Sequence, residues 1–156
     1  MKDQVLREIF LAGCDYSSVL DEWVEPMEKA LSGQTAAQAI ERPGGPETKG
    51  VWDIVLHMAV WNENIVERVK TGQKSVPAEG AWPRPPEHPA EMAWEDAKKR
   101  LMVSVSNLRN LIQECPMDQL ITNGYGLADI LCRFIHNGYH LGQIVKLREC
   151  FNPKGL

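Results

Sequence analysis

Apolar residues recur at steps of three and four over four long stretches of the sequence. This spacing places them on one face of an α-helix, and such a face must be buried against other helices. No stretch shows the alternation of period two that is typical of a β-strand. The pattern therefore predicts an all-α fold, a four-helix bundle that the whole chain, residues 1–156, forms as a single domain.

Proline, glycine and turn residues mark where the expected helices begin and end. The expected helices are residues 6–26, 50–71, 90–114 and 127–152. The residues expected to end them are Pro26, Gly72, Pro116 and Asn152-Pro153. Residues 27–31 should add one short turn, residues 42–46 should form a loop, and a turn at 123–126 should precede the fourth helix.

The faces that should be buried follow from the same periodicity. On the first helix they are expected to comprise Leu6, Ile9, Phe10, Gly13, Tyr16, Leu20, Trp23 and Val24. On the fourth helix they are expected to comprise Leu127, Ile130, Leu131, Phe134, Leu141 and Val145. Similar apolar stripes run from Val51 to Val69 and from Trp94 to Ile112 on the second and third helices.

A proline-rich segment around Trp82 separates the second and third expected helices. Its prolines are Pro77, Pro83, Pro85, Pro86 and Pro89. Because proline cannot donate a backbone hydrogen bond, we expect an extended loop here. The loop is either a lid over a site or a stiff connection that packs one tryptophan on the bundle.

Charge and composition exclude several classes of protein. The net charge is −4, and there is no cluster of Lys and Arg of the kind that binds nucleic acid. No apolar run approaches the roughly 20 residues that cross a bilayer, and the N-terminus lacks the apolar run of a signal peptide. We therefore expect a cytoplasmic protein with no nucleic-acid or membrane partner.

The cysteines are far apart and lie in helical patterns. They are Cys14, Cys115, Cys132 and Cys150. None of them forms the Cys-x-x-Cys spacing of a thiolate zinc site. We expect reduced residues in or near the core, and a catalytic thiol is the less favoured alternative.

His136 and His140 are four residues apart, so on a helix both imidazoles point the same way and can bind one metal ion. The alternative is a pair of partly exposed polar residues. The pair shares a side of its helix with Ile144 and Leu147, which indicates burial and favours the metal site. His57, at the edge of an apolar stripe, is the candidate third ligand; its alternative is a hydrogen-bonded core residue.

His88 lies in the proline-rich loop, and we interpret it as surface. Asp53, Glu63 and Asn137 are candidate partners for the imidazoles, but each is equally well explained as a helix cap or a surface residue. The sequence identifies no catalytic acid or base.

The chain resembles the DinB-like (damage-inducible) superfamily of metal-binding four-helix bundles. The resemblance lies in DIVLHMAVW at 53–61, in HNGYHLGQI at 136–144, and in LSGQTAAQA at 31–39 with the following Arg42-Pro43. It implies that His57, His136 and His140 bind one divalent metal ion and that the protein forms a homodimer. It also implies that a low-molecular-weight thiol can serve as co-substrate.

Three neutral imidazoles leave a divalent ion, zinc or nickel above all, with an open position for water or substrate. The leading hypothesis is a metal-dependent enzyme that activates a thiol or water against a small-molecule substrate, as a thiol S-transferase or a hydrolase does. The alternative is a non-catalytic metal-binding or stress-related binding protein. A third hypothesis is that the histidines only stabilise the bundle.

Overall fold

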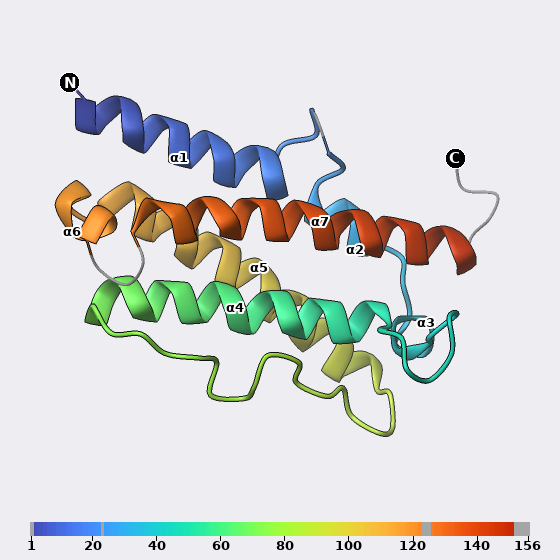
Figure 1. Ribbon diagram of the computed structural model, residues 1–156. Helices are drawn as coiled ribbons and strands as arrows, with labels where there is room; N and C mark the ends of the chain where they lie inside the picture. Colours follow the sequence, from blue (N-terminus) through green and yellow to red (C-terminus); the bar gives the residue numbers. More distant parts are fainter. Residues whose placement is uncertain (1, 23, 123–125, 152–156) are drawn as a thin grey trace.

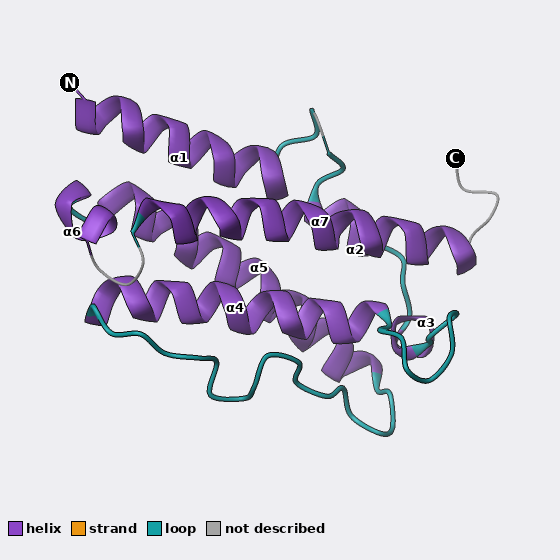
Figure 2. Cartoon of the chain, in the orientation of Figure 1, coloured by secondary structure: helices purple, strands orange, loops and turns teal. Residues whose placement is uncertain are grey.

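The computed structural model describes residues 2–22, 24–122 and 126–151. Within these ranges the secondary structure is helical, with one isolated bridge between Asp21 and Val24 and no strand (Figure 2). The helices of the described residues are α1 (Lys2–Ser18), α2 (Met27–Leu31), α3 (Ala36–Ile40), α4 (Val51–Thr71), α5 (Glu91–Glu114), α6 (Met117–Thr122) and α7 (Leu127–Phe151). The predicted all-α fold is confirmed. Trp23, most of the turn at 123–126 and the helix end at Asn152-Pro153 lie outside the described residues.

The long helices α1, α4, α5 and α7 pack as the predicted bundle. α4 lies against α5 and α7, and α1 lies against the same two helices (Figure 1). α1 and α7 run in one direction, whereas α4 and α5 run in the other. None of the helices in the described part of the chain is long and apolar enough to cross a membrane.

Because α4 and α5 are parallel, the chain must return along the whole bundle between them. α4 has 21 residues, which corresponds to about 31 Å. The proline-rich segment covers this distance without helical structure, as predicted, and runs beside α4 (Figure 1). Its path brings Ala81 and Trp82 against His57, in the N-terminal third of α4.

α4 begins and ends where the sequence predicted. The Asp53 carboxylate accepts a hydrogen bond of 2.9 Å from the Gly50 N–H, which satisfies a backbone donor at the helix start. Gly72 ends the helix with φ at 70°, a left-handed conformation that glycine adopts without strain. The expected apolar stripe of α4 is buried.

α1 departs from the prediction, because it ends at Ser18 and not near Pro26. The Ser17 hydroxyl donates to the Cys14 carbonyl, and such bonds compete with helical structure. Val19 and Leu20, 44% and 38% exposed, add no buried surface that would extend the helix. The expected burial of Leu20 is therefore wrong.

The buried face of α1 is also rotated from the expected one. Phe10 is buried as predicted, but Ile9 and Tyr16 are exposed. The buried residues of α1, Phe10, Cys14 and Ser18, follow one another at steps of four. Gly13 lies beside this row, where a Cβ atom would lie 2.7 Å from the Phe134 ring, and Ile9 and Tyr16 lie on the opposite side of Gly13 from the buried row.

For α7 and for the cysteines, the predicted burial is right at some residues and wrong at others. Leu131, expected inside, is 53% exposed, whereas Phe134 and Leu141 are buried. Cys14 and Cys115 lie in the core, but Cys132 and Cys150 are exposed, contrary to the expectation for all four. The outer face of α7 thus carries more apolar surface than a strictly amphipathic helix.

The short helices α3 and α6 were not predicted. α3 begins at a capping box in which Thr35 Oγ1 accepts from the Gln38 N–H and the Gln38 side chain accepts from the Thr35 N–H. α6 follows Pro116, which ends α5 as expected but also starts the next helix. Both signals were present in the sequence.

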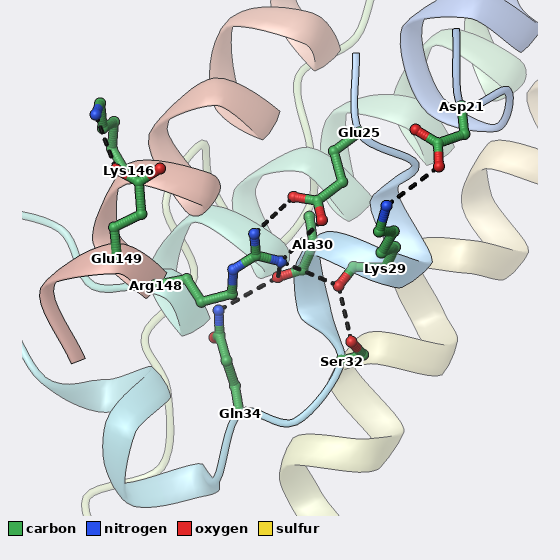
Figure 3. A network of polar contacts seen from close by, with 9 residues as sticks. All are labelled: Asp21, Glu25, Lys29, Ala30, Ser32, Gln34, Lys146, Arg148 and Glu149. Carbon is green, nitrogen blue, oxygen red and sulfur yellow. Dashed lines mark hydrogen bonds and ion pairs between the residues drawn. The ribbon is translucent and has the colours of Figure 1, made fainter. Parts of the chain in front are cut away.

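Arg148 joins the C-terminal part of α7 to α2 (Figure 3). Its guanidinium donates to the Glu25 carboxylate at 2.8 Å and to the Lys29 carbonyl at 3.2 Å. The carbonyls at the end of a short helix lack intrahelical partners, so Arg148 stabilises α2 while it closes one end of the bundle.

Candidate metal centre

Three histidines from two helices converge inside the bundle. His57 lies in the second turn of α4, and His136 and His140 lie one turn apart on the adjacent α7. The His136 Nε2 atom is 2.8 Å from His57 Nε2 and 3.1 Å from His140 Nε2. His57 and His140 are buried and His136 is half-buried. The structure thus brings together the three residues predicted as ligands, while metal binding itself stays a prediction.

The outer nitrogens of two of these rings have acceptors as partners. The Ala81 carbonyl oxygen lies 2.5 Å from His57 Nδ1, and a carbonyl can only accept, so His57 Nδ1 carries the proton. His140 Nδ1 lies 2.7 Å from Gln143 Oε1, while Gln143 Nε2 donates to the Tyr139 hydroxyl. In the neutral rings, His57 Nε2 and His140 Nε2 therefore present lone pairs to the centre of the cluster.

His136 has the opposite arrangement. The Arg133 guanidinium donates to His136 Nδ1 at 3.0 Å, so the proton of the neutral His136 ring lies on Nε2. This N–H points at the lone pairs of His57 and His140. Without an ion, one hydrogen atom is shared among three nitrogens.

The electrostatics of the cluster keep the imidazoles neutral. Burial lowers the pKa of His57 to about 4 and that of His136 to about 3. Burial also lowers the pKa of His140. The Arg133 charge depresses the pKa of His136 further. Neutral rings are the form that binds metal.

Aromatic rings enclose His57. The Trp82 indole stacks on the imidazole with ring centres 3.7 Å apart and planes 12° from parallel. Trp61 meets the same imidazole edge-on at 6.5 Å, and the Arg133 guanidinium lies over the Trp61 ring. The tryptophan of the proline-rich loop thus packs on the bundle at the histidine cluster.

The groups that contact the outer nitrogens of the imidazoles are not the three candidates, Asp53, Glu63 and Asn137, that the sequence offered. Asp53 and Glu63 pair with Arg42 and Arg100, so neither holds an imidazole. Asn137 donates to Asn62 at 3.2 Å, although its side chain also raises the pKa of His136 slightly against the effect of burial.

The partners that the sequence reasoning missed are Arg133, Gln143 and Ala81. Arg133 precedes His136 by three residues and Gln143 follows His140 by three, so both pairs could be read from helical spacing. Ala81 acts through its backbone carbonyl. No side-chain pattern could have identified it.

The donor set fits a divalent ion. Imidazole nitrogens bind zinc at about 2.0–2.1 Å, which in a tetrahedral site separates them by about 3.3 Å. The observed separations of 2.8 and 3.1 Å from His136 Nε2 are a few tenths of an ångström shorter than this, and all three ligand atoms lie within 4.8 Å of one another. His136 must also release its Nε2 proton, since a nitrogen that carries a proton cannot bind metal.

Other candidate residues do not join this cluster. His88 is exposed in the loop, as predicted. Burial raises the pKa of Cys14 to about 12, so its thiol stays protonated and unreactive at neutral pH. Within the described ranges, His57, His136 and His140 are the group of His, Cys, Asp or Glu side chains whose geometry suits a metal ion.

No protein-family model, curated protein or solved structure matches the chain significantly. The comparisons therefore supply no support for the DinB-like resemblance, which stays a prediction. What stands is an all-helical protein with a buried three-histidine cluster.

Proposed function

We propose that His57, His136 and His140 bind one divalent metal ion, zinc or nickel, and that the loaded protein is an enzyme acting on a small molecule. The observation that carries the proposal is the convergence of three imidazoles whose ligand atoms lie within 4.8 Å of one another. Membership of the DinB-like superfamily, which the matching histidine positions suggest, is part of the proposal.

The chemistry follows from the ligand set. A divalent ion on three imidazoles has an open position, where it lowers the pKa of bound water toward about 7 or binds a thiolate. This favours a thiol S-transferase, with a low-molecular-weight thiol as co-substrate, or a hydrolase.

The chain's own residues position this site. The Ala81 carbonyl and the Gln143 side chain hold the His57 and His140 rings so that Nε2 faces the centre. Trp82 covers one face of His57 and excludes water from it. The Tyr139 hydroxyl accepts from Gln143, so its own proton stays free to donate to a substrate beside His140.

Metal content tests the proposal directly. Untagged protein analysed by elemental mass spectrometry should contain about one equivalent of metal, because burial keeps the imidazoles in the neutral form that binds metal. A His136→Ala/His140→Ala double variant should contain little, and His88→Ala, which removes an exposed histidine, should match the wild type. Equal and negligible metal in all three proteins would refute the site.

The same preparations separate an enzyme from a closed binding site. With cobalt in place of the native ion, an open position should bind added azide or 2-mercaptoethanol and change the visible spectrum. An unchanged spectrum would favour the alternative, a metal-binding protein without turnover.

A further inference from the structure

A pocket of about 500 Å³ lies beside the histidine cluster, between α4, α7 and the proline-rich loop. The His140 ring and the Trp82 indole form part of its wall. A molecule in this pocket therefore touches the cluster. The volume lies in the range of about 300–1,000 Å³ that is typical of sites for small molecules.

The charged residues of the pocket lining are lysines. Lys49 and Lys146 line it, and no acidic side chain does, although the net charge of the chain is −4. Lys146 is paired with Glu149 at 2.8 Å. The Lys49 ammonium lies 5.0 Å from the centre of the Trp82 ring and has no carboxylate partner among the described residues. Lys49 is thus a positive charge without a compensating negative one.

The remaining lining combines apolar surface with hydrogen-bond donors. Ile54 and Leu147 are apolar, and the Trp82 and Tyr139 rings provide aromatic surface. The Tyr139 hydroxyl, which accepts a hydrogen bond of 3.0 Å from Gln143 Nε2, has its proton free. The pocket therefore offers donors and a cation at one part of its wall and apolar contacts at another.

We propose that this pocket binds a small organic carboxylate whose charge pairs with Lys49 and whose apolar or aromatic body lies against Trp82 and Tyr139. A larger pocket of about 800 Å³ also borders Lys49 and Trp82. Its lining combines three acids, Glu47, Asp53 and Glu87, with three cations, Arg42, Lys49 and Arg84, so it lacks the net positive charge that favours a carboxylate. This proposal rests on the proposed function in one respect, because it names the class of substrate that would react at the three-histidine site.

Benzoate and benzamide, which have the same shape but differ in charge, are suitable probes. Titrations of the full-length protein, metal-free and metal-loaded, are followed by ¹H–¹⁵N NMR. Benzoate should shift the signals of Lys49, Tyr139 and the Gln143 side-chain amide with saturation. Benzamide should bind about tenfold more weakly, the contribution of one charge-assisted hydrogen bond.

A Lys49→Met variant should weaken benzoate about tenfold in the same titration, while keeping most of the apolar stem. Lys99→Met, which removes an exposed lysine of α5, should leave the affinity unchanged. Equal binding of benzoate and benzamide, undiminished binding to Lys49→Met, or no saturable shifts at these residues would each overturn the proposal.

The two proposals fail in different ways. Benzoate binding at Lys49 in a chain that takes up no metal would refute the metal centre and leave the carboxylate pocket standing. A chain that takes up one ion but shows no benzoate binding at Lys49 would refute the carboxylate pocket and leave the metal centre standing.

Discussion

Each imidazole of the cluster has a different partner at its outer nitrogen, and the partner decides which inner nitrogen carries a proton. Ala81 and Gln143 offer oxygens that accept, the usual arrangement around a metal-bound histidine. Arg133 offers a donor to His136. Burial lowers the pKa of Arg133 to about 10, which still leaves it charged at neutral pH.

Arg133 should therefore oppose metal binding. When the neutral His136 ring binds an ion through Nε2, its proton moves to Nδ1, and the guanidinium donor aimed at Nδ1 then faces an N–H group in place of an acceptor. Its positive charge also repels the ion. We expect Arg133→Met to raise zinc affinity roughly tenfold, measured by competition with a chromophoric chelator.

Arg109→Met is the matched control for this prediction. Arg109 lies on α5 and pairs with Asp15 at 2.7 Å. Its loss should not change zinc affinity. Weaker zinc binding in Arg133→Met at unchanged thermal stability would mean that Arg133 supports the site and would contradict the prediction.

Polar side chains connect three of the long helices within the core. Asn62 of α4 donates to Ser104 of α5 at 3.1 Å and accepts from Asn137 of α7 at 3.2 Å. All three residues are buried. Because hydrogen bonds depend strongly on geometry, this network favours one register of α4 against α7, and the histidines need that register to meet.

Asn62→Ala should destabilise the bundle by about 2–4 kcal/mol. The substitution leaves the buried Asn137 amide without its acceptor and opens a small cavity. Urea denaturation in the presence of EDTA measures the change without a contribution from metal binding. Asn107→Ala, at an exposed position of α5, should change stability by less than about 0.5 kcal/mol. Equal effects of the two substitutions would show that the network adds nothing.

One face of the molecule is apolar and is not covered by other described residues. Its side chains are Val5, Ile9 and Tyr16 of α1 and Leu131 and Ile135 of α7, all between 38% and 66% exposed. α1 and α7 are parallel and in contact, so the apolar side chains on their exposed faces lie on neighbouring helices. An apolar surface that continues across two helices is typical of an interface.

We propose that a second copy of the chain covers this face in a twofold homodimer, because a surface patch of this kind can pair with itself. Light scattering coupled to size-exclusion chromatography should give the mass of a dimer for the wild type. Ile135→Glu should give a monomer, since it places a charge in the interface. The Val103→Glu variant, which changes an exposed residue of α5, should remain a dimer. A monomeric wild type would refute the interface.

The sequence predicted α4 and α5 well because the relevant signals act over one or two turns. Gly72 ends α4, Pro116 ends α5, and the apolar stripe of α4 is buried as its spacing indicated. The convergence of His136 and His140 follows from helical geometry alone. His57, 79 residues from His136 along the chain, was proposed as the third ligand from its position at the edge of an apolar stripe and from the family resemblance, since no spacing links it to the other two.

Packing settled the features that depend on distant contacts. Periodicity shows that α1 has an apolar face, but the packing of α1 on α5 and α7 buries Phe10, Cys14 and Ser18 and leaves Ile9 exposed. The crossover from α4 to α5 carries Ala81 to His57, where a backbone carbonyl sets the tautomer of a candidate ligand. Local spacing determines the direction of side chains within one helix. The rotation of that helix and the path of a loop follow from the summed free energy of many contacts, which no short stretch of sequence contains.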